Sequence, residues 1–282
     1  MYGSWKQWRR GSLTVTALAV VLDLLGAGHI QVTAYTVRCP GLPEAFSGLK
    51  IALITDLHGA FLDDGGQALA QAATGADLIA ISGDLFDQGT QLEQVLPAIR
   101  ALCRTAPVYY VSGNHEWTVE NRREVWAQME EAGVTLLDNH WVTLERQGAS
   151  IVLVGIQDPN GPADRPTPES VFAGMPQGQY TVLLYHRNTE PQVWGPLGAN
   201  LVLSGHGHGG LVRLPLIGGL ADTDRGLFPR YDAGVYQVQG ATLVVSRGLG
   251  NNPGGFRLFN GPEVPMLTLI SEGLHTIPED SD

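Results

Sequence analysis

Residues 78–87 constrain the fold more than any other part of the chain. They read Leu-Ile-Ala-Ile-Ser-Gly-Asp-Leu-Phe-Asp. The first half is a short aliphatic run, which is typical of a strand buried on both faces. Gly83 ends this run, and the carboxylates of Asp84 and Asp87 follow just past the expected strand end. Because ligands bind at this edge in open α/β sheets, these residues predict a functional site there.

The same arrangement occurs at two other aliphatic runs. A single Gly-Asp pair could simply cap a helix, but residues 50–55 also end in Asp56-Leu57-His58, and residues 108–111 are followed by Gly113-Asn114-His115-Glu116. The segments between these runs have helical character, most clearly residues 92–102, where apolar side chains recur at helical spacing. This βαβ pattern predicts that all three strand ends lie at one edge of one sheet.

The second half of the chain is richer in expected strands and adds three histidines. His186 follows the apolar run 181–185, and His206 and His208 follow the run 201–204 within a glycine-rich segment. Glycines there allow unusual backbone angles and a close approach of imidazoles to an ion. Other strands are expected at 30–37 (an edge strand), 141–145, 151–155, 235–238, 243–246 and 266–270, helices at 65–75 and 122–132, and a loop at 158–168.

The side chains at these strand ends form a metal-ligand set. A lone histidine there is usually structural, but the recurrence of the pattern argues against that interpretation. The set mixes oxygen and nitrogen donors without thiolates, which suits Mn, Fe or Zn. Seven donors are enough for two ions that share Asp84, and two such ions would acidify a bridging water, which as hydroxide is the nucleophile for phosphoryl displacement. The set is Asp56, His58, Asp84, Asn114, His186, His206 and His208.

The net charge and the number of cysteines argue against certain binding partners and certain kinds of site. The chain of 282 residues has a formal net charge of −11, which argues against a nucleic-acid-binding surface. A phosphate substrate then needs a local source of positive charge, which bound metal ions supply. The only cysteines are Cys39 and Cys103, too few for a disulfide framework or a thiolate zinc site. We expect both to be apolar core residues, although a single bridge between them stays open.

The N-terminal segment predicts membrane targeting. Basic residues up to Arg10 precede an uncharged stretch at 11–22, and Asp23 is the first acidic residue of the chain. This pattern is typical of a signal peptide or signal-anchor, so we expect residues 1–30 to be an anchor or a cleaved signal. The catalytic domain, residues 31–282, would then lie outside the cytoplasm, at the membrane or secreted. The alternative is a buried hydrophobic helix of a soluble protein.

Taken together, the strand-end motifs resemble a known family. Asp56-x-His58, Gly83-Asp84-x-x-Asp87, Gly113-Asn114-His115-Glu116, His186 and Gly205-His206-x-His208 are similar to the five motifs of the calcineurin-like metallophosphoesterases. The resemblance spans roughly residues 48 to 270. It implies an α/β fold, namely a four-layer α/β/β/α sandwich with a di-metal site at the sheet edge. From the pattern of the N-terminal segment, we expect a hydrophobic anchor helix to precede this domain.

The resemblance also implies a role for each residue. His115 would protonate the leaving group or stabilise the phosphate in the transition state, and Asp87 would orient its imidazole. Glu116 replaces the Asp often found in the third motif, without changing this interpretation. One ion would be held by Asp56, His58, Asp84 and His208, and the other by Asp84, Asn114, His186 and His206.

Three segments, namely Gly209-Gly210, residues 245–250 and residues 257–263, resemble a membrane-anchored or exported bacterial subgroup, whose members are described as phosphodiesterases or phosphohydrolases. We therefore expect a monomeric phosphodiesterase whose substrate is soluble or lipid-linked. A phosphomonoesterase and a pyrophosphohydrolase acting on a lipid-linked nucleotide sugar are alternatives. A catalytically silent metal-binding module of the cell envelope is a third, against which the His115–Asp87 pair argues. Four arginines could contact phosphate or form structural ion pairs, namely Arg187, Arg225, Arg247 and Arg257.

Overall fold

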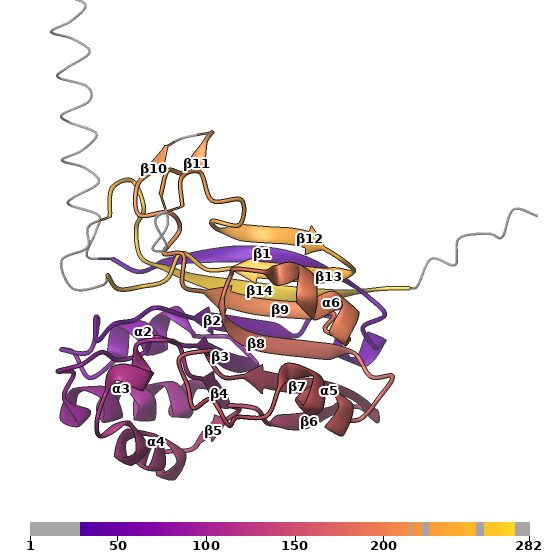
Figure 1. Cartoon of the computed structure of the whole chain (residues 1–282), viewed down its shortest axis with the longest axis horizontal. Coiled ribbons are helices and arrows are strands. Elements are labelled where there is room, and N and C mark those ends of the chain that lie inside the picture. Colours follow the sequence, from indigo (N-terminus) through magenta and orange to yellow (C-terminus); the bar gives the residue numbers. More distant parts are fainter. Residues whose placement is uncertain (1–28, 215, 222–225, 252–256, 274–282) are drawn as a thin grey trace, which may run out of the picture.

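The fold contains two six-stranded sheets, as seen in a computed structural model that describes residues 29–214, 216–221, 226–251 and 257–273 (Figure 1). The first sheet combines the early strands of the chain with its last one. Strands β2 to β5 are parallel, β14 is antiparallel to β2, and β1 is parallel to β14. In spatial order its strands are β1 (Gln31–Pro40), β14 (Glu263–Glu272), β2 (Lys50–Ile54), β3 (Leu78–Ser82), β4 (Val108–Val111) and β5 (Val134–Leu136).

The second sheet is built from the later strands. Its central strands β7, β8, β9 and β13 are parallel, and the two outer strands are antiparallel to their neighbours. In spatial order its strands are β12 (Gly234–Val238), β13 (Ala241–Val245), β9 (Leu201–Gly205), β8 (Thr181–Arg187), β7 (Ala149–Ile156) and β6 (Trp141–Arg146). A small hairpin, β10 (Arg213–Leu214) and β11 (Gly218–Gly219), stands apart from both sheets.

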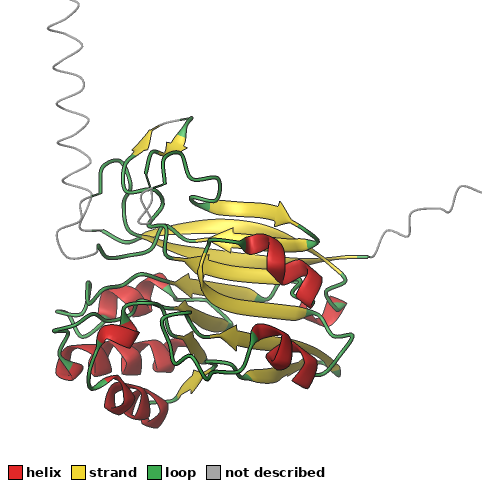
Figure 2. Ribbon diagram, viewed as in Figure 1, coloured by secondary structure: helices red, strands yellow, loops and turns green. Residues whose placement is uncertain are grey.

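Helices lie on the outer faces of the two sheets (Figure 2). Apolar side chains of α2, α3 and α4, such as Leu69, Ile99 and Met129, pack on the first sheet, and those of α5 and α6 pack on the second. A third apolar cluster joins the sheets and includes Leu53 and Leu184. The helices are α2 (Gln67–Ala72), α3 (Leu92–Thr105), α4 (Arg122–Glu131), α5 (Pro168–Gly174) and α6 (Trp194–Leu197), with short 3-10 turns η1 (Glu44–Phe46), η2 (Glu116–Thr118) and η3 (Pro191–Val193).

The structure confirms the expected α/β sandwich and refines several details. The helix expected at 65–75 is limited to α2, and β5, α5 and α6 were not expected. Cys39 and Cys103 are both free thiols, so the possible bridge between them is not formed.

The predicted anchor helix within residues 1–30 lies almost entirely outside the described residues. No helix in the described part of the chain is both long and apolar enough to cross a membrane.

Candidate metal centre

The candidate site lies at the carboxyl ends of β2, β3, β4, β8 and β9. Backbone hydrogen bonds tie the first two ends together, because the N–H of Asp56 donates to Gly83 O (3.1 Å) and that of His58 donates to Asp84 O (3.0 Å). Five of the seven predicted ligands have left-handed backbone, which is uncommon for non-glycine residues and concentrates at functional sites. These five are Asp56, His58, Asp84, His206 and His208.

One group of donors comprises Asp56, His58 and His208, whose ligand atoms all lie within 4.8 Å of one another. The Nε2 atoms of His58 and His208 are 3.1 Å apart, and Nε2 of His208 is 3.6 Å from Oδ1 of Asp56. All three side chains are buried. A carboxylate and two imidazoles that converge away from water form a donor set suited to a divalent transition metal.

The second group comprises Asp84, His186 and His206. Nε2 of His186 is 3.2 Å from Oδ2 of Asp84 and 3.2 Å from Nδ1 of His206. The amide oxygen of Asn114 lies 3.1 Å from the same Nε2 atom. Oδ2 of Asp84 is also 3.7 Å from Nε2 of His58, so this oxygen lies between the two groups. The structure therefore brings all seven predicted ligands together at one place.

His115 and Asp87 lie beside these groups. Oδ1 of Asp87 is 2.6 Å from Nδ1 of His115 and 2.9 Å from Nδ1 of His58. The His115 side chain is 25% exposed, whereas the side chain of His58 is fully buried. His115 is thus partly accessible to solvent, with its ring held by Asp87.

Burial and neighbouring charges shift the pKa values of several residues in the site. Burial alone would lower the pKa of His186, but the charge of Asp84 and the hydrogen bond to it raise that pKa to about 10. Burial, together with the charges of Arg257 and His58, lowers the pKa of His208 to about 3. Burial opposes ionisation of Asp87, yet hydrogen bonds from His115 and His58 lower its pKa to about 2. Buried carboxylates held in this way favour a bound cation.

Glu116 has a structural role that the sequence did not indicate. Its carboxylate accepts hydrogen bonds from the backbone N–H groups of Asp84 (3.1 Å), Leu85 (2.6 Å) and Gly113 (2.9 Å). It therefore joins the loops that follow β3 and β4. Burial and the neighbouring charge of Asp84 raise the pKa of Glu116 to about 8. The sequence shows only that Glu116 follows His115. That position does not predict hydrogen bonds from its carboxylate to the backbone of two loops.

Close approach explains two glycines of the motifs. A Cβ atom on Gly113 would overlap Oδ1 of Asp84, and a Cβ atom on Gly205 would overlap Oδ2 of Asp56. Each glycine therefore leaves room for a carboxylate of the site. Glycine is required here because a carboxylate lies close to the backbone, not because of the turn conformation.

The arginines considered from the sequence have partners within the protein. Nε of Arg187 is 2.7 Å from Oδ2 of Asp158, and Nε of Arg247 is 3.0 Å from Oε2 of Glu263, which confirms the ion-pair interpretation for both. Arg257 donates to the carbonyls of Arg247 and Gly250, and its Nη2 atom lies 3.1 Å from Nδ1 of His208. Arg225 lies outside the described residues.

Comparison with known proteins identifies the family. The family model described as calcineurin-like phosphoesterase matches residues 49–210, more than half of the chain. The chain belongs to the calcineurin-like phosphoesterase family. It is accordingly a phosphoester hydrolase, and the matched range covers the strand ends that carry all seven predicted ligands, as well as His115 and Asp87.

Individual relatives agree with this family. "Phosphodiesterase YaeI" of Escherichia coli (strain K12) is 31% identical over 199 residues, 69% of this chain and 70% of that protein. "Uncharacterized metallophosphoesterase YkuE" of Bacillus subtilis (strain 168) is 27% identical over 250 residues, 86% of each chain. "Transmembrane protein with metallophosphoesterase domain" of Bos taurus is 28% identical over 283 residues, 91% of this chain and 61% of that protein.

Proposed function

We propose that this phosphoesterase is a di-metal phosphodiesterase with Asp84 as the ligand shared by both ions. The position of Oδ2 of Asp84 between two groups of buried donors carries this proposal. When bound, divalent ions would supply positive charge to the phosphoryl oxygens and lower the pKa of water. The residues suit Mn, Fe or Zn, with Asp56, His58, Asp84 and His208 around one ion and Asp84, Asn114, His186 and His206 around the other.

His115 acts in this proposal as the proton donor to the leaving oxygen. Its Nδ1 atom lies 2.6 Å from Oδ1 of Asp87, so the ring N–H there donates to the carboxylate and Nε2 is left to face the substrate. Burial alone would lower the pKa of His115, but the hydrogen bond to Asp87 and the charge of Asp84 raise it. A raised pKa favours the protonated form of His115, which a general acid requires.

The diester preference rests on a relative and on the surrounding charges. The E. coli relative is named a phosphodiesterase. A diester carries one negative charge where a monoester carries up to two, so a diester needs fewer additional cations. Arg187 and Arg247 are already paired with Asp158 and Glu263, which leaves their charge compensated inside the protein. Both observations favour a diester.

We assign residues 1–30 to a membrane anchor or signal and residues 31–282 to a catalytic domain outside the cytoplasm. The basic flank and uncharged stretch of the N-terminal segment support this assignment. A relative that is named a transmembrane protein with a metallophosphoesterase domain is consistent with it.

Hydrolysis of two chromogenic esters tests the proposed activity. The full-length chain, depleted of metal, is assayed with bis-p-nitrophenyl phosphate and with p-nitrophenyl phosphate after addition of Mn, Fe, Zn or Mg. We expect metal-dependent turnover that is faster for the diester. Faster turnover of the monoester would indicate a phosphomonoesterase. Turnover of neither ester with any metal would indicate a metal-binding module without catalysis.

A further inference from the structure

Large apolar side chains are exposed around the β10–β11 hairpin. Seven large hydrophobic residues in the described part of the chain are exposed, and four of them lie here. Leu216 is fully exposed, and Ile217, Leu227 and Phe228 are 62%, 76% and 64% exposed. Single exposed apolar residues are normal on a protein surface, whereas a group of them marks an interaction site. We call these four residues the apolar hairpin surface.

Backbone contacts hold the four residues in one structural unit. Leu227 pairs with Ala221 across an isolated bridge, and the N–H of Phe228 donates to Leu220 O (2.9 Å). Leu220 directly follows β11. Leu216 and Phe228 both have left-handed backbone (φ of 68° and 53°), which is unfavourable for bulky side chains. Leu216 and Phe228 thus combine an unfavourable backbone conformation with an exposed apolar side chain, a combination that suggests a functional role for this surface.

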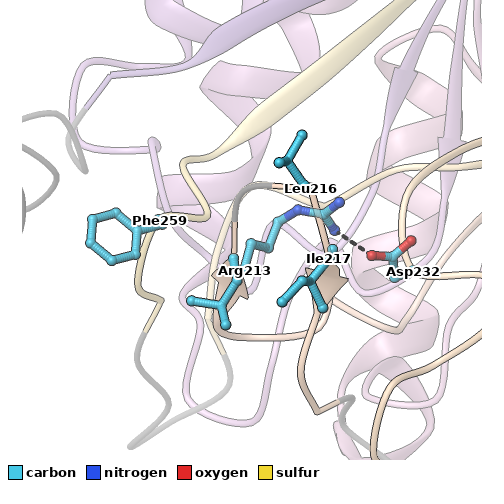
Figure 3. A pocket seen from close by; sticks show the side chains of 7 residues that line it. Arg213, Leu216, Ile217, Asp232 and Phe259 are labelled. Carbon is cyan, nitrogen blue, oxygen red and sulfur yellow. Dashed lines mark ion pairs between the residues drawn. The ribbon is translucent and has the colours of Figure 1, made fainter.

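Polar contacts tie the hairpin to Asp232, beside the apolar side chains of Leu216 and Ile217 (Figure 3). Arg213 and Asp232 form an ion pair at 2.9 Å, and Oδ2 of Asp232 also accepts the N–H of Gly219 at 2.6 Å. The side chains of Leu216, Ile217 and Phe259 surround a pocket of about 480 Å³ beside this pair. The exposed leucine and isoleucine are therefore held on a braced hairpin.

The hairpin is attached directly to the histidine loop of the site. Nη1 of Arg213 donates to Gly209 O at 2.7 Å, next to His208 in the chain. Asn260, which follows Phe259, donates through Nδ2 to His208 O at 2.7 Å. The apolar hairpin surface thus belongs to the same edge of the molecule as the candidate metal centre.

The N-terminal segment joins the domain at this edge as well. Gln31 pairs with Glu263 at the start of β14, and β14 runs antiparallel to β2 with Met266 opposite Ala52. This register places Gln31 level with the carboxyl end of β2, where the predicted ligands begin. Nη2 of Arg247 also donates to Oε1 of Gln31 at 3.1 Å. Residues 1–30 therefore precede the domain at its site edge.

We propose that the apolar hairpin surface contacts a lipid bilayer and holds the site edge of the domain against it. This inference rests on the proposed assignment of residues 1–30 to a membrane segment. A bilayer is the favoured occupant because an uncharged stretch at 11–22 leads into the domain at the edge that carries these apolar side chains. Two membrane contacts also bind far more stably than one. A phosphoester carried by a membrane lipid would then reach the site without leaving the bilayer.

Fluorescent labelling at single positions tests the contact. The full-length chain carries Cys103→Ser, and Leu216→Cys is labelled with an environment-sensitive fluorophore; Leu227→Cys serves as a second labelled position. The matched control is Glu145→Cys, at an exposed position of β6. Glu145 pairs with Ser150 near the start of β7, so it lies at the end of the second sheet away from the candidate metal centre. Each variant is reconstituted in phosphatidylethanolamine–phosphatidylglycerol vesicles, with and without lipids that carry a quencher in the acyl chain.

We expect both hairpin labels to emit at shorter wavelength in vesicles and to be quenched by those lipids, while the Glu145→Cys label does neither. Hairpin labels that behave like the control on vesicle-bound protein would overturn the proposal, as would a chain that is not recovered with vesicles. A shift to shorter wavelength that lipid quenchers leave unchanged would assign the surface to contact with a second copy instead. Hydrolysis of the soluble diester by the unlabelled chain is measured separately, so failure of the activity and failure of the membrane contact remain distinguishable.

Discussion

At the scale of single residues, Asp87 orients two imidazoles through one carboxylate oxygen. Its Oδ1 atom lies 2.6 Å from Nδ1 of His115 and 2.9 Å from Nδ1 of His58. Each ring donates its Nδ1–H to this oxygen, which leaves Nε2 of His58 as a lone-pair donor and, when His115 is protonated, Nε2–H of His115 as a proton donor. For His58 that partner is the proposed metal, and for His115 it is the substrate. In the proposed mechanism, one carboxylate therefore links metal binding to proton transfer.

Replacement of His115 separates these two roles. In His115→Ala we expect the metal content to stay close to that of the wild type, because His115 is not among the proposed ligands. The rate should fall by roughly 10²–10⁴, the usual contribution of a positioned acid. The loss should be smaller for p-nitrophenyl esters than for alkyl esters, since p-nitrophenolate leaves without needing a proton. Steady-state kinetics with both ester classes, together with metal analysis, measure these quantities.

Two results would change the assignment of His115. An equal loss across leaving groups would indicate that the imidazole stabilises phosphate charge instead of donating a proton. Loss of the metals together with the activity would mean that His115 is a ligand or a structural support.

The pH profile reports on the contact between Asp87 and His115. Burial alone would lower the pKa of His115, and the hydrogen bond to Asp87 and the charges of Asp84 and Asp87 raise it overall. Asp87→Asn removes one of these charges, so the pKa of His115 should fall and its acid form should be lost at a lower pH. The basic limb of the profile of kcat/KM should therefore move to lower pH. His115→Ala provides the control, because that limb should be absent from its residual activity; a limb at the wild-type pH in Asp87→Asn would contradict the assignment.

At the scale of elements, strand ends carry the site, and aliphatic runs made most of these strands predictable. Strands β2, β3, β4, β8 and β9 each consist of an apolar run followed by polar residues or glycine. The three-residue strand β5 is too short to produce a periodic pattern. Helix α5 begins at Pro168 with Thr167 as its cap, so a proline that suggested a loop instead starts a helix.

The backbone conformation at the strand ends was not predictable from residue types. Asp56, His58, Asp84, His206 and His208 have positive φ, which sequence patterns assign to glycine by default. Such residues cost about 1–3 kcal/mol each and persist because surrounding contacts determine them. Those contacts come from remote segments, as when Glu116 accepts hydrogen bonds from the loop after β3.

The ends of β3 and β4 should differ in their effect on metal content. Asp84 follows β3, and its Oδ2 atom lies between both donor groups, whereas the Asn114 oxygen, after β4, contacts His186 of one group. Asp84→Asn should therefore lower metal occupancy at both sites, and Asn114→Ala should mainly affect one. Metal analysis of the purified variants measures this difference. Retention of two full equivalents in Asp84→Asn would contradict the bridging role.

The loop after β4 also has a steric requirement. A Cβ atom on Gly113 would overlap Oδ1 of Asp84, so Gly113→Ala should displace that carboxylate and lower metal content and activity together. Gly273→Ala is the matched control, because no described residue lies within 4 Å of a Cβ atom there, and it should behave like the wild type. Metal analysis and diester hydrolysis report both effects. A Gly113→Ala variant with full metal content would show that the loop adjusts without moving Asp84.

At the scale of the whole molecule, the order of strands was less predictable than their existence. The last strand, β14, inserts between β1 and β2 in the first sheet, and this pairing joins segments more than 200 residues apart. Local periodicity carries no information about such partners, so the sequence alone indicated an edge strand at 30–37 but not its neighbour. The convergence of strand ends was predictable, because parallel strands joined by helices share one edge.

The charge pattern of the segment that precedes β1 predicts on which side of the membrane the domain lies. Basic residues up to Arg10 precede the uncharged stretch 11–22, and positively charged flanks stay in the cytoplasm. Residues 31–282 should therefore lie on the other side of the membrane. A reporter that is active only outside the cytoplasm, fused to the C-terminus, should be active in cells, and a cytoplasm-specific reporter at the same position should be silent. The reverse pattern, with both fusions expressed at equal levels, would place the domain in the cytoplasm and favour a buried hydrophobic helix for the N-terminal segment.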